Sequence, residues 1–377
     1  MKLNNLILQN FRNYEDLCLD FAPGVNLIVG RNAQGKTNLL EAIAYLGSGK
    51  SFRAQKTGEL VRFGADFADM SGAVTSQGRE QSLRWVLFAD GRKRLCQRNG
   101  VKKRTAGEIA GVLPTVLFCP EDLMILKGGS GPRRRLGDQA LSQLRPNYEA
   151  ALTEYTRILE QKSRILKDWR ENPPLLEILP DYNTRLCQVG ALLISYRARF
   201  YEALGKAAAA YHGEFSGGAE EFLLQYKTVS TVTDPFAPTA VLTGQLQEHL
   251  ESHHRAELDS QQCLTGPHKD DFSLLLSGRE LKLYGSQGQT RTATVSLKLA
   301  QRELMGRELG EQPLLLLDDV LSELDPGRQD FVLNRIKTGQ VFITACEPGR
   351  FTELGKTIEI EKGQATPCPR IYEGGRA

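Results

Sequence analysis

The segment GRNAQGKT, residues 30–37, combines residue types and a spacing that suit phosphate binding. In the pattern GxxxxGK[ST], the glycines let successive backbone N–H groups turn toward phosphate oxygens, and the following helix presents its positive end. Lys36 would bridge the β- and γ-phosphates of a nucleoside triphosphate, and the Thr37 hydroxyl would bind Mg²⁺. An apolar strand, VNLIV, precedes the loop and a helical pattern follows it, which disfavours a chance match. We therefore expect ATP and Mg²⁺ as cofactors.

Two adjacent carboxylates further along the chain would complete this chemistry. The stretch PLLLLDDV places Asp318 and Asp319 after four leucines, which are typical of a strand buried on both faces of a parallel sheet. Neighbouring side chains of an extended chain point to opposite sides, so each carboxylate needs its own role. We assign Asp318 to Mg²⁺ and Asp319 to polarising the attacking water. The alternative is a pair that only caps a core strand. The predicted catalytic residues are Lys36, Asp318 and Asp319, and the predicted metal ligands are Thr37 and Asp318.

A second helix N-terminus is expected in YGSQGQTRTATVSLKLAQREL, which begins with small polar residues and then becomes helical. Ser286 and Gly288 would lie at this N-terminus, which also attracts phosphate. One nucleotide has one γ-phosphate, whereas the chain offers two helix N-termini suited to hold it. We infer that the two hold it from different subunits.

The apolar pattern predicts how these motifs are positioned. Strands are expected at residues 3–8 and 17–21 and around the turn DGRK, before a change of character at about Pro132. Two helical stripes of apolar residues then follow, at 148–169 and 186–204, with NPP between them. They predict an antiparallel pair of helices, each about 35 to 45 Å long. We predict that this pair is an insertion that splits one domain into two separate segments of the sequence.

Composition narrows the class of protein. A chain of 377 residues exceeds what one core usually organises, so two structural units are expected. The start of the chain lacks the apolar core of a secretory signal, and no run reaches the roughly 20 apolar residues of a membrane span. We expect a cytoplasmic protein with no membrane partner. His253 and His254 with Cys263 suggest a metal site only weakly, because adjacent histidines on a polar stretch are usually solvated.

The order of the motifs resembles the ABC-type ATPases of the SMC and Rad50 class, with SQGQ in place of the usual LSGGQ signature. Further segments resemble the RecF family of bacterial DNA replication and repair proteins. These segments are LILQNFRNYEDLCLDF, FCPEDLMILKGGSGPRRR, LSQLRPNY, LTGPHKDD and VLSELDPGRQ. The resemblance implies an α/β fold, an ABC-type P-loop ATPase head split by an inserted helical arm. The head would comprise residues 1–126 and 244–377, and the arm residues 127–243.

The resemblance also implies a head-to-tail dimer that closes on ATP. ATP at the loop of one subunit would be completed by the signature of the other, and Asp325 of LSELD would cross the interface. Arg12, in the turn NFRNY, would reach a phosphate. The full set of expected nucleotide-binding residues is Gly30, Arg31, Asn32, Ala33, Gln34, Gly35, Lys36, Thr37, Asn38, Arg12, Ser286, Gly288, Gln289 and Asp325.

The partners that the resemblance implies are DNA and the RecO and RecR proteins. An ATP-driven dimer would bind single-stranded DNA and duplex DNA or gap junctions, and would promote recombinase loading at single-strand gaps. Roles in replication restart and the SOS response, and a weak, DNA-stimulated ATPase, are implied as well. The form of DNA preferred and the surface that meets RecR stay open.

Two features depart from the wider ABC pattern. The usual general base is a glutamate, whereas Asp319 is shorter, so slow turnover is expected. The switch histidine expected after the strand QVFIT is absent, with Thr344 and Ala345 nearby, and this leaves the γ-phosphate sensor open.

Basic runs are the candidate DNA contacts. Residues 91–104 hold seven Lys or Arg, and Arg133–Arg135 form a second run. A solvated hairpin face is the alternative for the first run, and a role in orienting the helical arm is the alternative for the second. The motif GPHKDD makes His268 a weak site candidate beside the nucleotide or the dimer interface.

Two other classes of function are also compatible with the sequence. An ATPase subunit of an ABC transporter would share the signature but lacks so long a helical insertion. A small-molecule P-loop kinase would have no use for SQGQ or SELD.

Overall fold

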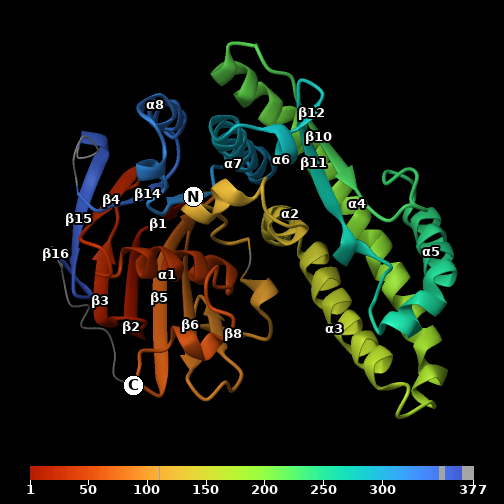
Figure 1. The fold of residues 1–377 in the computed structure, drawn as a ribbon. Coiled ribbons are helices and arrows are strands. Elements are labelled where there is room, and N and C mark those ends of the chain that lie inside the picture. The colour runs from red at the N-terminus through yellow and green to blue at the C-terminus, as the bar shows by residue number, and fades with distance from the viewer. Residues whose placement is uncertain (110, 348–352, 367–377) are drawn as a thin grey trace. The chain divides into compact units, whose positions relative to one another are not determined.

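The computed structural model describes residues 1–109, 111–347 and 353–366, and its contacts divide the chain into two compact units (Figure 1). The first unit contains Met1–Leu123 together with the chain from Gln301 onward. The second unit is Met124–Ala300. Each unit has its own sheet and helices, so the motifs that the sequence singles out are distributed over two separately packed bodies.

The predicted nucleotide loop, residues 30–37, follows a strand of a mostly parallel sheet in the first unit. The strand order is β16-β15-β4-β14-β13-β9, in which only the β15–β16 pair is antiparallel. Because carboxyl ends of parallel strands meet at one edge, the residues after β4, β13 and β14 come together there. The bounds are β4 (Val25–Val29), β9 (Thr115–Phe118), β13 (Leu314–Leu317), β14 (Val341–Ala345), β15 (Gly355–Glu361) and β16 (Gln364–Thr366).

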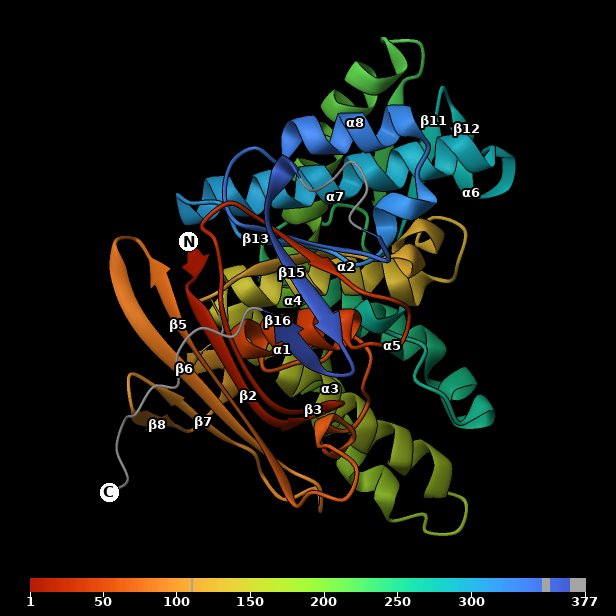
Figure 2. The same cartoon turned by 90° about the vertical axis from the view of Figure 1, so that its left-hand side faces the viewer.

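A second sheet of the first unit is antiparallel, with the order β3-β2-β5-β6-β7-β8 and β1 paired to β5. Figure 2 shows its long strands β5 and β6 curving along their length. Alternate residues of these strands are buried, as expected when one face of a sheet meets the core. The bounds are β1 (Lys2–Leu3), β2 (Asn5–Phe11), β3 (Tyr14–Asp20), β5 (Phe67–Ser76), β6 (Arg79–Phe88), β7 (Leu95–Arg98) and β8 (Val101–Lys103).

Helix α1 (Lys36–Ser48) packs between these two sheets. Its apolar residues Leu39, Leu40 and Ile43 are fully buried in one core with residues of both sheets. Gly72 of β5 allows close approach, because a Cβ there would lie 2.7 Å from Cδ2 of Leu46. The first unit also holds α8 (Pro326–Arg335). The packing of α1 between the two sheets fixes its N-terminus, and with it the nucleotide loop.

The second unit is largely helical and carries a small antiparallel sheet. Helix α4 contacts α3 on one side and α5 on another, which Figure 1 shows as neighbouring helices. The strand order of the small sheet is β10-β11-β12. The bounds are α2 (Ser130–Leu144), α3 (Pro146–Asp168), α4 (Leu175–Ser216), α5 (Thr239–Ser260), α6 (Leu281–Tyr284), α7 (Gln287–Leu309), β10 (Phe222–Lys227), β11 (Asp271–Leu276) and β12 (Arg279–Glu280). Helix α7 begins in the second unit, and its part from Gln301 onward belongs to the first.

The second helix of the arm is longer than the sequence suggested. Helix α3 has 23 residues, close to the expected length, but α4 has 42 residues, or about 63 Å at 1.5 Å per residue. Its buried residues extend beyond the predicted stripe, since Ala208 and His212 are also buried. Pro180 lies inside α4 near its start and does not end it.

The compact units also divide the chain differently from the predicted segments. The expected boundary between residues 243 and 244 falls inside α5, and the second unit continues to Ala300. The physical reason is apolar packing: Leu242, Leu246 and Leu250 of α5 share a core with Cys187 and Ile194 of α4. A boundary within α5 would cut this core.

Within the described residues, no helix combines the length and the apolar character needed to cross a membrane.

Candidate functional site

The loop between β4 and α1 is shaped by glycine. A Cβ on Gly30 would lie 2.3 Å from the backbone oxygen of Ile360. Gly35 has a φ of 123°, and a Cβ there would lie 2.6 Å from Nδ2 of Asn13. Ala33 also has a positive φ, of 64°. No larger residue fits at positions 30 and 35, because neighbouring chain packs directly against the loop.

Residues from the turn between β2 and β3 and from the end of β15 hold the loop in place. Asn13 Nδ2 donates to Gln34 O at 2.8 Å, and the Tyr14 hydroxyl donates to Gly35 O at 2.9 Å. The backbone N–H of Lys362 donates to Gln34 Oε1 at 2.6 Å. Asn13 and Tyr14 were not predicted to support the loop, since nothing in their local pattern shows that they meet residues 34 and 35.

Lys36 is buried and directed along the loop. Its Nζ donates to Gly30 O at 2.8 Å and to Arg31 O at 3.4 Å. It also lies 4.0 Å from Asp319 Oδ2 and 3.8 Å from Cys346 Sγ. The ammonium group is therefore fixed at the mouth of the loop, where a polyphosphate would meet it.

Thr37 and Asp318 lie side by side, although 281 residues separate them in sequence. Thr37 Oγ1 donates to Asp318 Oδ1 at 3.0 Å, and Thr344 Oγ1 donates to the same oxygen at 3.0 Å. Burial raises the pKa of Asp318, and the two hydroxyl hydrogen bonds oppose that rise. A hydroxyl and a carboxylate oxygen, close together at the end of two elements, match the oxygen donors that Mg²⁺ prefers.

Asp319 lies beside the same loop, which differs from the prediction that the two carboxylates point to opposite sides. The chain leaves the extended conformation at Asp319, whose φ is 49°. Its side chain is consequently within 4.0 Å of Lys36 Nζ, while Asp318 contacts Thr37. The alternation expected of a strand does not apply one residue past its end.

Thr344 connects the two carboxylate residues. Its hydroxyl donates to Asp318 Oδ1 and accepts the backbone N–H of Asp319 at 2.8 Å. Thr344 was expected only near the position of the missing switch histidine. Its polarity on the otherwise apolar strand VFITA was the available signal. Cys346, two residues later, also contacts the loop, and its Sγ lies 3.0 Å from Asn32 Oδ1.

Arg12 and Asn38 are tied to protein groups near the loop. The Arg12 guanidinium donates to both oxygens of Glu41, at 2.8 and 2.9 Å, and to the backbone oxygen of Glu59. Asn38 Nδ2 donates to Asn13 Oδ1 at 2.8 Å. Arg12 therefore lies at the expected turn, but its side chain is engaged with the buried Glu41 of α1.

The signature residues belong to the second unit. Ser286 Oγ accepts the backbone N–H of Gln289 at 3.1 Å, and Gln289 Oε1 accepts the backbone N–H of Ser286 at 2.8 Å. This reciprocal capping box starts α7, and Gly288 lies in its first turn. The helix N-terminus expected from the sequence is thus present, and the Gln289 side chain takes part in building it.

Asp325 caps a different helix, in the first unit. Its carboxylate accepts the backbone N–H of Arg328 at 3.1 Å at the start of α8 and pairs with the Arg328 guanidinium. Burial would raise the pKa of Asp325, but these contacts with Arg328 lower it overall.

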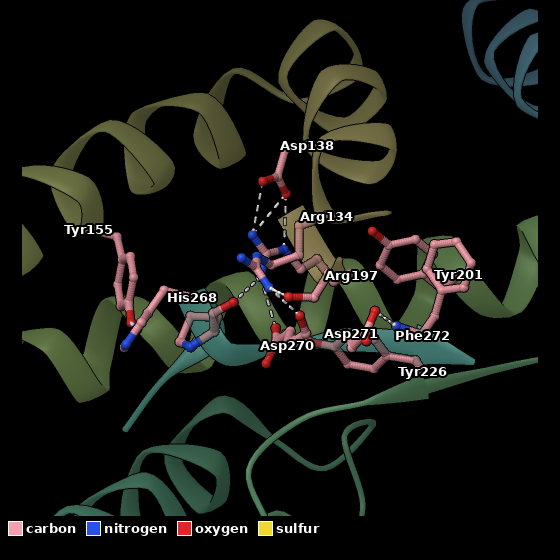
Figure 3. Close-up of polar contacts among 12 residues, drawn as sticks. Arg134, Asp138, Tyr155, Arg197, Tyr201, Tyr226, His268, Asp270, Asp271 and Phe272 are labelled. Atoms are coloured by element: carbon pink, nitrogen blue, oxygen red, sulfur yellow. Dashed lines mark hydrogen bonds and ion pairs between the residues drawn. The ribbon is translucent and has the colours of Figure 1, made fainter. Parts of the chain in front are cut away.

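GPHKDD forms part of a buried polar network in the second unit, which Figure 3 shows. The guanidinium of Arg197 donates to Asp270 at 2.8 Å, to Pro267 O at 2.6 Å and to Asp138 at 3.0 Å. His268 pairs with the Tyr155 hydroxyl at 2.7 Å and with Cys263 O at 3.0 Å. Burial lowers the pKa of His268 to about 4. The described contacts of His268 lie within the arm, so they support packing there.

The basic run at 133–135 is mostly engaged in the same region. Arg133 is buried and pairs with Asp271 at 2.5 and 2.9 Å, and Arg134 donates to Asp270 O at 2.7 Å. These contacts support the alternative that the run orients the arm.

The run at 91–104 forms the hairpin of β7 and β8. Arg94 donates to the Tyr45 hydroxyl and lies over the Trp85 ring, and Arg92 pairs with Asp90. Lys93 and Lys102 are exposed.

In the described part of the chain, no group of three or more His, Cys, Asp or Glu residues could hold a metal ion. The weak suggestion of a metal site at His253, His254 and Cys263 therefore has no structural support. His253 instead stacks on His249, with ring centroids 4.0 Å apart.

Comparisons with known proteins identify a family and a fold for this chain. A family model described as the RecF/RecN/SMC N terminal domain covers residues 2–366. The DNA replication and repair protein RecF of Clostridioides difficile (strain 630) is 37% identical over 367 residues, covering 96% of this chain and 97% of that protein.

Two solved structures extend the likeness to the whole fold. A structure of the recombination mediator protein RecF-ATPrS in the RecFOR pathway has a TM-score of 0.90 and 33% identity, covering 97% of both chains. A structure of RecF-ATP in the same pathway has a TM-score of 0.88 and 34% identity, covering 96% of both chains. The fold is that of an ABC-type ATPase head with an inserted helical arm. From its nucleotide loop, its aspartate pair and these near full-length matches, we conclude that the chain belongs to the RecF family.

Proposed function

We propose that this chain is an ATP-dependent DNA-binding clamp of recombinational DNA repair and replication restart. The observation that carries the proposal is the meeting of Thr37, Asp318 and Lys36 at one edge of the parallel sheet. The solved relatives named RecF-ATP and RecF-ATPrS support ATP as the nucleotide. Lys36 would contact the β- and γ-phosphates, and the backbone N–H groups of residues 30–38 would surround them.

Thr37 and Asp318 would hold Mg²⁺. Thr37 Oγ1 lies 3.0 Å from Asp318 Oδ1, and a hydroxyl beside a carboxylate supplies the oxygen donors that Mg²⁺ prefers. Bound Mg²⁺ neutralises charge on the phosphate oxygens. The Thr344 hydroxyl keeps the Asp318 carboxylate oriented toward Thr37. Burial disfavours the charged form of this carboxylate and so raises its pKa.

Asp319 would orient the attacking water in a weak, DNA-stimulated ATPase. Asp319 Oδ2 lies 4.0 Å from Lys36 Nζ, the group that would contact the terminal phosphate, and this proximity supports the proposed role. If Asp319 has this role, Asp319→Ala should slow single-turnover hydrolysis by roughly 100-fold or more, a size typical of general-base loss. An unchanged single-turnover rate would remove Asp319 from the mechanism.

The second half of the site would come from another copy of the chain. Ser286, Gly288 and Gln289 start α7, whose N–H groups suit a phosphate, and Asp325 starts α8. We assign these four residues to the dimer interface that closes on ATP. Arg12 would support the loop through Glu41 and reach phosphate only if that ion pair opens.

DNA and the RecO and RecR proteins are the proposed partners. The solved relatives are described as recombination mediators of the RecFOR pathway, which supports this class of partner and a role in recombinase loading at gaps. A role in the SOS response belongs to the same proposal. We assign two exposed lysines of the basic run to DNA phosphates: Lys93, which precedes β7, and Lys102, which lies on β8.

Analytical ultracentrifugation tests the clamp directly. The chain should sediment as a monomer without nucleotide, as a dimer with ATP and Mg²⁺, and as a DNA-bound dimer after duplex DNA is added. Ser286→Arg should keep ATP binding and lose the dimer, because a long cation would fill the space of the partner's nucleotide. A monomer that ignores both ATP and DNA would contradict the proposal, as would a Ser286→Arg variant that dimerises normally.

A further inference from the structure

The first turn of the signature helix α7 is held by the side chain of Gln289, which also forms a hydrogen bond outside that turn. In the capping box, Gln289 uses its Oε1 to accept the N–H of Ser286, while Ser286 Oγ accepts the N–H of Gln289. The amide nitrogen of Gln289 is then directed away from the box. Any group that holds this nitrogen also fixes the direction of Ser286.

Glu220 holds that nitrogen. Gln289 Nε2 donates to Glu220 Oε1 at 2.7 Å, and Glu220 lies in the short segment between α4 and β10. The hydrogen bond from Gln289 is the main reason that the pKa of Glu220 lies below its usual value. The carboxylate is therefore ionised when it receives the amide, which makes this a charge-assisted hydrogen bond.

The other oxygen of Glu220 is anchored on the arm. His212 Nε2 lies 2.8 Å from Glu220 Oε2, and His212 is fully buried on α4 with its ring 5.3 Å from that of Phe222. The buried imidazole cannot move without repacking α4, so Glu220 has one fixed end. A chain of contacts thus runs from α4 through Glu220 and Gln289 to Ser286.

Lys127 supports the same turn from another direction. Its Nζ donates to Gly285 O at 2.7 Å and to Leu281 O at 3.4 Å. Gly285 is the residue directly before Ser286, and a Cβ there would lie 2.3 Å from Leu281 Cδ1. The backbone on the N-terminal side of Ser286 is therefore also fixed, which leaves the Gln289 side as the part that Glu220 controls.

We propose that Glu220, backed by His212, is a positioning residue for the signature motif: it holds Gln289 so that Ser286 and the first N–H groups of α7 point toward the nucleotide of a partner subunit. This inference rests on the proposed function, since it needs a nucleotide shared between two copies. Residues that present phosphate ligands must be held by neighbours whose own positions are fixed. Glu220 should consequently affect dimerisation and leave the nucleotide loop of its own subunit unchanged.

The test compares Glu220→Ala with Glu220→Gln and with Glu221→Ala. In Glu220→Gln the new side-chain carbonyl can still accept the Gln289 amide, and Glu221 is an exposed neighbour whose backbone bonds Ser277. We expect the ATP-dependent dimer of Glu220→Ala to dissociate about 10-fold more readily, a size typical of one hydrogen bond to a charged group. The other two variants should stay within about 3-fold of the parent chain, less than the loss of one neutral hydrogen bond. Binding of ATP to the monomer should be unchanged in all three.

A donor–acceptor exchange separates positioning from simple folding. Gln289→Glu keeps the capping box, for which Glu is a standard residue, but sets a carboxylate against Glu220. It should weaken the dimer about 10-fold, as expected when a charge-assisted hydrogen bond is lost. The double variant Glu220→Gln with Gln289→Glu restores an amide-to-carboxylate hydrogen bond in reverse and should recover the parent dimer. Thermal unfolding of each variant shows whether the arm remains folded.

The Ser286→Arg variant shows which proposal fails if the results differ. If Ser286→Arg dimerises normally, the shared nucleotide itself is wrong. If Ser286→Arg abolishes the dimer but Glu220→Ala or Gln289→Glu dimerises like the parent, only the positioning role is overturned. A double variant that shows no recovery also overturns it.

Discussion

The nucleotide loop and the helical arm are stabilised in contrasting ways. The loop is built from backbone groups and two glycines, and its supports are hydrogen bonds to backbone oxygens from Asn13 and Tyr14. The arm is held by buried charges, with Arg197 between Asp138 and Asp270 and Lys162 on Glu257 at 2.5 Å. The loop is predicted to bind a charged ligand, whereas the buried charges of the arm are paired with one another. Substitutions should therefore separate ligand binding from stability.

The largest expected effect is on the arm. Arg197→Met removes the partner of Asp138 and Asp270 but keeps a long apolar side chain, so two carboxylates lose their cation in a buried site (Figure 3). Breaking a buried pair by removing one partner costs about 3–5 kcal/mol. Urea unfolding should show this loss, and ATP binding at Lys36 should remain within about 2-fold, as expected for independent sites in two separately packed units. Lost ATP binding in folded protein would contradict the separation of the two regions.

A substitution in the nucleotide loop should have the opposite effect, with ligand binding lost and stability little changed. Lys36→Ala should weaken ATP binding by roughly 100-fold, because two charge-assisted contacts to phosphate are lost at about 1.5 kcal/mol each. Calorimetric titration measures the affinity, and Lys2→Ala, an exposed lysine of the same unit, is the control. The urea midpoint should change little, since the hydrogen bonds of Nζ to oxygen are to two loop carbonyls and its contacts with Asp319 and Cys346 are long, at 4.0 and 3.8 Å. A large stability loss would show that the loop is a structural support as well.

Acid should weaken the arm through His268. Burial lowers its pKa to about 4, so the folded arm keeps it neutral while the unfolded chain protonates near pH 6.5. Stability is complete above about pH 6.5 and falls as the pH drops toward 4, by on the order of 2 kcal/mol for a half-buried ring. His268→Gln should flatten this part of the pH profile, whereas His254→Gln, on an exposed residue, should not. An equal slope in both variants would assign the acid sensitivity to other groups.

The smallest expected effect is at Thr344, where the nucleotide region does rely on a long-range side-chain contact. Thr344→Val removes the hydroxyl that orients Asp318 and accepts the N–H of Asp319. Hydrolysis should fall about 10-fold and the Mg²⁺ concentration for half-maximal rate should rise, as expected for one or two hydrogen bonds. Thr344→Ser keeps the hydroxyl and should recover most of both. A drop in rate with no change in Mg²⁺ dependence would limit Thr344 to packing.

Much of the first unit could be predicted because its signals are local. The strand, loop and helix around residues 25–48 and the strand before Asp318 lie where the pattern put them. The helical insertion was also predicted, since apolar stripes are local too. The length of α4 was underestimated at both ends, because the helix runs from Leu175 to Ser216 and its last turns contain small residues such as Ala208, which a stripe of large apolar residues does not reveal.

The amino-acid sequence alone determined the chemistry of this protein: a phosphate loop, an aspartate pair, a signature helix and the family resemblance. Only the tertiary structure decided the geometry around them. It turned Asp319 toward Lys36 through a left-handed backbone, engaged Arg12 with Glu41, and tied Gln289 to Glu220. The physical reason is that residue type and spacing fix what a side chain can do, while its direction depends on packing partners far away in the chain.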